Sequence, residues 1–296
     1  MFNKLRELTG TEPTLHEDGS YTPSKLAVKV TSPAKTDYDH ATYPDAVTGG
    51  NRKILIICTE GRYLTTTANG DRFRTGNHPV EIFVVLLHLE KAGFGLDFAT
   101  ISGAPVPLEE WGMPMEDETV LDIIERYRPN LDKPLSLPDV IANRLGDDSP
   151  YIAIYIPGGH GAVLGLPESR EVKHVLQWVL DTDRHLISIC HGPAAFLSLT
   201  IDEDPKSFPL SGYKYSGFPD SGDKLLPLIG YLPGKMPWYF GEKLDAVGMK
   251  NVSNMPNGTI HEDRRLLSGD SPSAANALGG LAARRLLDTI AAKKPA

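Results

Sequence analysis

Cys190 occupies the position in this sequence that most favours covalent chemistry. It directly follows the apolar run Leu186–Ile189 and is followed by His191-Gly192-Pro193, so it lies in a tight turn between an expected buried strand and an expected helix. Such a turn exposes the side chain above the sheet edge, and the free amides and positive dipole of the helix start favour a thiolate. The pattern indicates a nucleophile elbow with cysteine in place of serine. A structural cysteine that ends a core strand is the alternative.

Several polar residues could assist this thiol. His191 adjoins it in the sequence, and a cysteine–histidine pair is the usual way to activate such a nucleophile. The imidazole then needs an orienting acid, and Asp220 and Asp223 are both candidates by spacing. Glu81 lies in the first turn of an expected helix, where carboxylates are common because they complement the helix dipole. If Glu81 also reaches Cys190, it could hold a proton and transfer it.

A glycine pair follows another expected strand, Tyr151–Ile156, in the sequence Gly158-Gly159-His160. Glycines at a strand end allow the backbone to approach a ligand closely, and their N–H groups could form an oxyanion hole. A plain turn would give the same residues. We predict that Gly158, Gly159 and His160 bind the substrate or its oxyanion.

The remaining cysteine and the histidines give weaker signals. Cys58 also ends an expected strand, but a loop follows it instead of a helix, which favours a small core residue. With two cysteines in the whole chain, a disulfide framework is excluded. Nine histidines are present, but neither a C-x₂-C nor an H-E-x-x-H motif occurs. We therefore predict no metal ion and no other cofactor.

The elements that must position these residues form an alternating pattern. Continuous apolar runs predict buried strands at 53–58, 96–101, 151–156 and 186–189, with helices between them. This order predicts an α/β fold with a mostly parallel central sheet and helices on both faces. Ligands of such sheets bind at the carboxyl ends of the strands, where the candidate residues occur.

Two regions interrupt the alternation. Residues 1–50 are polar and show no persistent period, so we expect an extended N-terminal arm. Residues 103–150 are rich in proline, and we expect them to form an inserted cap lobe that covers the site. Residues 51–296 then form one α/β domain that includes this lobe.

Charge and hydropathy exclude several classes of protein. The 296 residues contain 30 Lys and Arg against 38 Asp and Glu, a formal net charge of −8, which disfavours a nucleic-acid-binding surface. The longest strongly apolar run, Ile82–Leu87, is far too short to span a membrane. The first ten residues lack the apolar segment of a secretory signal. We expect a cytoplasmic protein without membrane contacts.

Taken together, the motifs resemble the ThiJ/PfpI superfamily, and within it the HchA-type branch of heat-shock chaperones, glyoxalases III and protein or nucleotide deglycases. The resemblance extends from about residue 20 to the C-terminus and rests on eight ordered motifs. They are Thr75–Glu81, Trp111–Pro114, Ile156–Gly161, Gly165–Ser169, Ile189–Ala195, Phe218–Asp220, Ile229–Gly234 and Leu267–Pro272. The resemblance implies a flavodoxin-like sandwich and a homodimer.

The same resemblance implies roles for the candidate residues. Cys190 would be the nucleophile, with His191 and Asp223 as the other members of a triad. Glu81 would hydrogen-bond the thiol, and Gly159 would contribute to the oxyanion hole together with the amide of His191. The implied reaction is the glutathione-independent conversion of methylglyoxal to D-lactate through a cysteine hemithioacetal. Early glycation adducts would be further substrates, and unfolded proteins would be clients of a holdase activity.

The sequence departs from the branch at one point. Some HchA-type proteins bind zinc through two histidines and a carboxylate, and the matching positions here are Glu90, Gly95 and Tyr127. Because glycine has no side chain to offer and tyrosine is an unusual ligand, we predict that this zinc site is absent.

Other functions of a reactive cysteine stay open at this stage. A cysteine peptidase or amidase is one alternative, although the His-x-Glu pattern of amidotransferase relatives is missing downstream of Cys190, where His261 is the only histidine after His191. A non-enzymatic chaperone is another. A redox sensor is the third, because an exposed thiol of low pKa oxidises readily.

Overall fold

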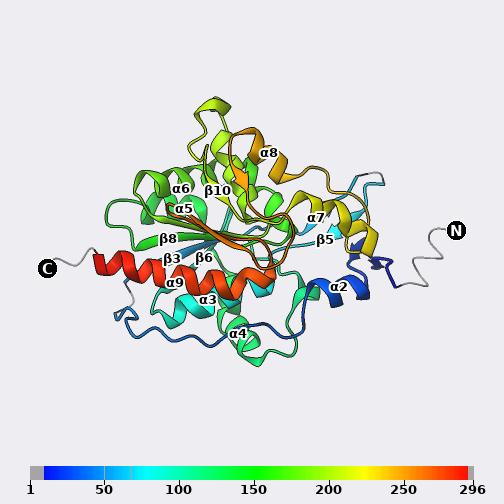
Figure 1. The fold of residues 1–296 in the computed structure, drawn as a ribbon, viewed down its shortest axis with the longest axis horizontal. Coiled ribbons are helices and arrows are strands. Elements are labelled where there is room, and N and C mark those ends of the chain that lie inside the picture. Colours follow the sequence, from blue (N-terminus) through cyan, green and yellow to red (C-terminus); the bar gives the residue numbers. More distant parts are fainter. Residues whose placement is uncertain (1–9, 50, 68, 293–296) are drawn as a thin grey trace.

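The computed structural model describes residues 10–49, 51–67 and 69–292 and is built around one seven-stranded sheet (Figure 1). All neighbouring strands in it are parallel except the pair at one edge, β12 and β13. In spatial order the strands are β12 (Ile260–Asp263), β13 (Leu266–Gly269), β9 (His185–Ile189), β8 (Tyr151–Ile156), β3 (Lys53–Ile57), β6 (Gly95–Thr100) and β7 (Leu135–Ser136).

Helices cover both faces of this sheet, as Figure 1 shows. The face that carries Ile54 and Ile56 packs against α3 (Pro79–Lys91), α4 (Glu118–Asp132) and α9 (Ala275–Ala292). The face that carries Leu55 and Ile57 packs against α5 (Leu137–Arg144), α6 (Arg170–Asp181) and a 3₁₀ helix at Gly192–Thr200, on which α8 (Phe240–Ala246) lies. Alternate residues of each strand thus enter opposite cores. The predicted α/β sandwich with a mostly parallel sheet is confirmed.

The region 103–150 differs from the expected cap lobe. Its helix α4 buries Val120, Ile123 and Ile124 against the same core as α3. Its strand β7 then pairs with β6 and extends the sheet by one strand. The region therefore supplies part of the sandwich, and its stretch before α4 reaches the site. The pattern concealed this because β7 is only two residues long.

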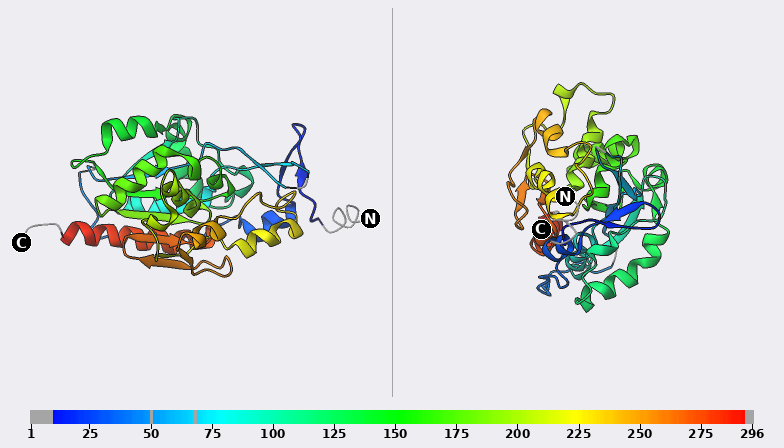
Figure 2. Two further views of the ribbon diagram at one scale, coloured as in Figure 1. Left: turned by 90° about the horizontal axis from the view of Figure 1, so that it is seen from above. Right: turned by 90° about the vertical axis from the view of Figure 1, so that its right-hand side faces the viewer.

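The N-terminal segment also contains regular structure, although residues 1–9 and 50 of the expected arm lie outside the described part. Its strands β1 (Thr14–Leu15) and β2 (Ser20–Thr22) join β5 (Arg72–Arg74) and β4 (Tyr63–Thr65) in a small sheet. This sheet lies at the end of the molecule away from the end of α9 (Figure 2). Helix α2 (Lys25–Thr31) follows.

The chain after residue 200 adds further short elements to the fold. It contains the short helix α7 (Asp220–Leu225) and the strands β10 (Lys214–Tyr215) and β11 (Lys250–Asn251), which pair in parallel. Among residues 10–49, 51–67 and 69–292, the structure contains no helix with the length and apolar character needed to cross a membrane.

The buried side-chain amide of Asn77 connects loops at the carboxyl edge of the sheet through hydrogen bonds. The side chain of Asn77 accepts a hydrogen bond from the Thr59 amide at 3.0 Å and donates to the carbonyls of Thr59 and Pro107, both at 3.0 Å. Because Asn77 is 1% exposed, water does not replace these bonds when the amide is lost.

We expect Asn77→Ala to lower the free energy of unfolding by about 2–5 kcal/mol, because it leaves buried backbone groups of Thr59 unpaired. Chemical denaturation measures the loss. The exposed Asn143→Ala, which loses one bond on the surface of α5, should change it by less than about 0.5 kcal/mol. Equal stabilities of the two variants would contradict this role of Asn77.

Candidate active site

Cys190 lies at the carboxyl end of β9 in a strained backbone conformation. Its φ is 56°, in the left-handed region that non-glycine residues rarely adopt. Two backbone hydrogen bonds hold it there: the Cys190 amide donates to Gly269, and its carbonyl accepts from the Phe218 amide, both at 2.8 Å. The predicted turn between a strand and a helix is thus present, although the helix that follows is of the 3₁₀ type.

His191 and Asp223 continue from the thiol in a buried chain of polar contacts. Sγ of Cys190 lies 3.2 Å from Nδ1 of His191, and Nε2 of His191 lies 3.1 Å from both carboxylate oxygens of Asp223. Burial alone would raise the pKa of Asp223, but the adjacent imidazoles lower it below its usual range. The carboxylate is therefore ionised and can orient His191.

The structure shows which of the two candidate acids, Asp220 or Asp223, contacts His191. Asp223 is fully buried and points from α7 toward the imidazole of His191. Asp220, one turn earlier, faces away and accepts hydrogen bonds from the amides of Gly241 and Glu242 at the start of α8.

Glu81 completes the immediate surroundings of the thiol. It lies in the first turn of α3 and is fully buried, and its carboxyl group lies near the Cys190 thiol and the Gly158 amide, although neither carboxyl oxygen makes a hydrogen bond of ordinary geometry. Burial raises the pKa of Glu81 well above its usual range, while the Cys190 thiol and the Gly158 amide oppose this shift. Burial therefore favours the neutral form of Glu81.

The thiol itself differs from expectation. The helix dipole was expected to depress its pKa, but burial raises the pKa of Cys190, and a negative charge on Glu81 raises it further. Two adjacent groups in one dry site are not both ionised, so at least one of Cys190 and Glu81 keeps its proton. The thiolate requires the neutral carboxyl beside it, and the amide of Gly159 also stabilises the thiolate.

The predicted glycine turn lies against these groups. A Cβ on Gly158 would come within 2.5 Å of Oε2 of Glu81 and 2.6 Å of Cβ of Cys190. Gly159 has a φ of 94°. The amide of His160 donates to Glu109 at 3.2 Å, so it is not free for an oxyanion, and the His160 imidazole contacts Asp223 at 3.1 Å.

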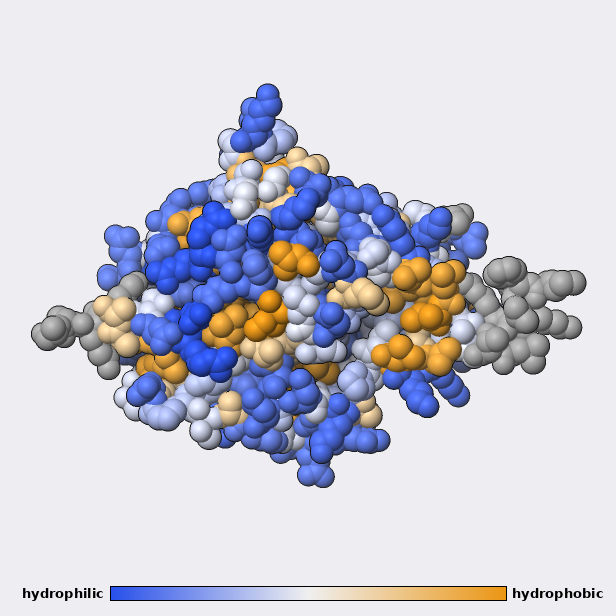
Figure 3. Space-filling model, viewed as in Figure 1, coloured by the Kyte–Doolittle hydropathy of each residue, from blue (hydrophilic) through white to orange (hydrophobic). Residues whose placement is uncertain are grey.

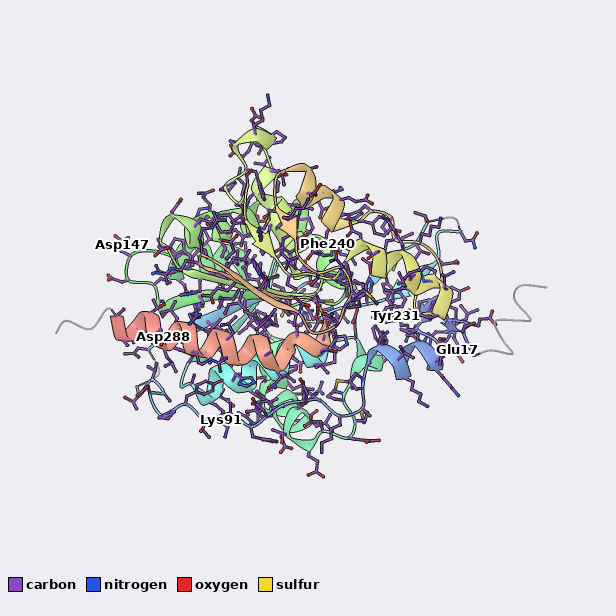
Figure 4. All side chains as sticks on the ribbon, in the orientation of Figure 1. Glu17, Lys91, Asp147, Tyr231, Phe240 and Asp288 are labelled. Atoms are coloured by element: carbon purple, nitrogen blue, oxygen red, sulfur yellow. The ribbon has the colours of Figure 1, made fainter. Side chains whose placement is uncertain are left out.

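These side chains line a cavity of about 420 Å³ at the carboxyl edge of the sheet. Tyr231 and Phe240, labelled in Figure 4, pack on the rings of His160 and His191, at centroid distances of 5.3 and 5.5 Å respectively. Buried residues with polar side chains that line the cavity include His78, Glu81, Glu109, His160, Cys190, His191 and Tyr231.

Sequence reasoning missed three of these lining residues. Burial lowers the pKa of His78 to about 3, so its imidazole is neutral, and burial raises the pKa of Glu109 to about 7. Tyr231 is the third. His78 and Tyr231 belong to motifs of the resemblance, which could have indicated them, whereas Glu109 precedes the motif at Trp111 and has no local signature.

Cys58 occupies a different environment. It is fully buried in the core beneath α3, and burial raises the pKa of its thiol. This is the environment of a small core residue, as the sequence indicates.

Two groups of residues bear on whether the site could hold a metal ion. Among the described residues, ligand atoms of His160, His191 and Asp223 lie within 4.8 Å of one another, a spacing that their hydrogen bonds already explain. The positions of the branch's zinc site do not fit that ion. Glu90 is bound by Arg126 through two hydrogen bonds and accepts another from Tyr127.

Comparison with known proteins identifies the family. A Pseudomonas aeruginosa protein named protein/nucleic acid deglycase HchA is 46% identical over 280 residues, which cover 94% of this chain and 96% of that protein. An Escherichia coli protein of the same name is 46% identical over 275 residues, covering 93% and 95%. The chain belongs to the HchA deglycase family. No protein-family model matches it.

Solved structures of other proteins share the fold of this HchA-type chain. A glyoxalase III from Candida albicans aligns with a TM-score of 0.60 and 20% identity, over 79% of this chain and 97% of its own. The 24 kDa rapid encystment protein of Francisella tularensis aligns with a TM-score of 0.65 and 19% identity, over 80% and 99%. Both alignments support the α/β fold of this chain.

We expect Gly158→Ala to displace Glu81 or Cys190, because its methyl group has no room between them. The variant should lose about 1–3 kcal/mol of stability and alter the rate at which iodoacetamide alkylates Cys190. Gly146→Ala is the matched control, since a Cβ there meets no heavy atom within 4 Å. If both glycine variants keep the wild-type stability and alkylation rate, the close contact described here is wrong.

Proposed function

We propose that this protein converts methylglyoxal and related 2-oxoaldehydes to 2-hydroxy acids without glutathione, with Cys190 as the nucleophile. One observation supports this more than any other: the thiol lies in a cavity between a neutral Glu81 and a His191 that is oriented by an ionised Asp223. This arrangement can bring an attacking sulfur and a group that carries protons to the same carbon atom of the substrate.

The first step is addition of the thiolate to the aldehyde carbon. A carbon–sulfur bond forms, the carbonyl π bond breaks, and the resulting oxyanion takes the proton that Glu81 held. Until it is protonated, the amide of Gly159 can stabilise this oxyanion, because it already faces the thiolate. The product is a hemithioacetal on Cys190.

The second stage moves a proton between the two carbons. Glu81, now ionised, or His191 removes the proton from the former aldehyde carbon, and the second oxygen takes up a proton from the site to give an enediol. The base then delivers its proton to the adjacent carbon, while the hydroxyl on the first carbon returns a proton to the site. The first carbon is oxidised to a thioester and the second is reduced to an alcohol by the same electron pair. Neither glutathione nor a nicotinamide is needed, and water then hydrolyses the thioester to release the hydroxy acid and the thiol.

The relatives support a related substrate class. The HchA proteins at 46% identity bear the name protein/nucleic acid deglycase, so we include early glycation adducts among the substrates. An adduct of methylglyoxal on an amine reaches the same hemithioacetal when sulfur bonds to the carbon, the carbon–nitrogen bond breaks and the amine leaves with a proton.

The direct experiment measures D-lactate formation from methylglyoxal without glutathione. Cys190→Ser should lower the rate at least about 10³-fold, because the nucleophile is lost. Glu81→Gln and Asp223→Asn should each lower it by about 10²–10⁴-fold. Cys58→Ala is the matched control and should keep the wild-type rate, which a chelator should also leave unchanged. Equal rates in wild type and Cys190→Ser would refute the proposal.

A second candidate function, the binding of unfolded clients, is favoured by an exposed apolar patch. Figure 3 shows apolar side chains gathered at the end of the molecule where α2 and α7 lie. The patch comprises Leu26, Val30, Leu225, Leu228 and Met255, which are 40–69% exposed. Val30, Leu225 and Met255 also border the cavity. Contiguous apolar surface of this kind is typical of interaction sites.

If this patch binds clients, Leu228→Ser should weaken suppression of the thermal aggregation of a model client while D-lactate formation persists. Leu15→Ser is the control, because Leu15 is 60% exposed but lies on the small sheet. Suppression that is equal in both variants and in wild type would exclude the patch as the client site.

A further inference from the structure

We propose that Glu109 is a second acid of the site, which protonates the oxygen of the ketone carbonyl next to the carbon that Cys190 attacks. This inference rests on the proposed function. It assigns the proton donor that enediol formation requires at the second carbonyl of a 2-oxoaldehyde.

The geometry leaves one oxygen of Glu109 fixed and the other free to act. Oε1 accepts hydrogen bonds from the Thr75 hydroxyl at 2.7 Å and from the His160 amide at 3.2 Å. The Glu109 backbone is also held, since its amide donates to Asn77 at 3.0 Å and its carbonyl accepts from Gly112 at 2.8 Å. Oε2 is buried and has no partner.

A buried carboxyl oxygen without a hydrogen-bond partner needs an explanation, because burying a polar atom without a hydrogen bond costs free energy. Glu109 is 1% exposed and lines the same cavity as Cys190 and Glu81. A proton on Oε2 removes the cost of a buried charge and makes Oε2 a donor to a substrate oxygen in that cavity. The two oxygens of a 2-oxoaldehyde then meet two separate acids, Glu81 at the first and Glu109 at the second.

The charges around Glu109 favour a carboxyl group that changes its protonation state near neutral pH. Burial raises the pKa of Glu109 to about 7, opposed by His160, by the Thr75 hydroxyl and by the amides of His160 and Gly76. Glu81 and Tyr231 are the other titratable groups that interact with it. Below about pH 7 Glu109 is protonated and can donate, and above that pH the donor is lost.

The proton balance closes with this assignment. When the base, Glu81 or His191, removes the proton from the first carbon, the electron pair moves to the second carbonyl and its oxygen takes the proton of Glu109. The enediol then collapses: the base protonates the second carbon, and the hydroxyl on the first carbon returns a proton to Glu109. Both groups end in their starting states, and the substrate has been isomerised to the thioester.

The experiment measures kcat and KM for D-lactate formation over a pH series. Glu109→Gln keeps the amide oxygen that Thr75 and His160 can bind but cannot transfer a proton, so we expect kcat to fall about 10²-fold or more with KM little changed. The fall of kcat above about pH 7 in wild type should disappear in this variant. The exposed neighbour Glu110→Gln should behave as wild type.

A second variant separates this role from a purely structural one. The Thr75 hydroxyl lowers the pKa of Glu109, so Thr75→Val should move the alkaline fall of kcat to higher pH. A structural role would instead change the melting temperature and reduce the rate equally at every pH.

The outcomes distinguish this inference from the proposed function. If wild type forms lactate and Glu109→Gln keeps the wild-type kcat and its fall at alkaline pH, Glu109 is not the acid, while the proposed function stands. If Thr75→Val does not change the pH at which kcat falls, another group causes that fall and the inference is again wrong. If wild type forms no lactate, the proposed function fails and takes this inference with it.

Discussion

The contact between the thiol of Cys190 and the buried carboxyl of Glu81 is the constraint on which the site depends. Both groups lie where water is excluded, and burial raises the pKa of each. They are therefore not ionised together, and the nucleophile becomes an anion only while its neighbour is neutral. In the proposed chemistry the proton of this neutral Glu81 is the one that the first oxyanion receives.

The fold provides this contact by bringing the ends of parallel strands together. Cys190 follows β9, the Gly158–Gly159 turn follows β8, and Glu81 opens the helix between β3 and β6. The backbone strain at Cys190 is maintained by hydrogen bonds on both sides, so the surrounding structure stabilises a conformation that the residue alone would avoid. Gly158 allows the three segments to approach because it has no side chain.

Part of this structure could be predicted from the sequence, and physical reasons limit the rest. The central strands are continuous apolar runs, so β3, β8 and β9 were predicted, whereas β7 is too short to give a period. Asp220 and Asp223 fit the same spacing, and only the resemblance and the packing of α7 distinguish them. The raised pKa of the thiol depends on burial and on Glu81, neither of which the sequence shows. Glu109 was missed because its partners come from distant segments.

The most direct test of this coupling follows thiolate ultraviolet absorbance and the infrared band of the protonated carboxyl on one sample across pH. Glu81→Gln identifies the Glu81 contribution to the carboxyl band, and Cys190→Ser identifies the thiolate. The account predicts that wherever the Cys190 thiolate is present in wild type, the protonated band of Glu81 is present as well. A thiolate that coexists with an ionised Glu81 would contradict it.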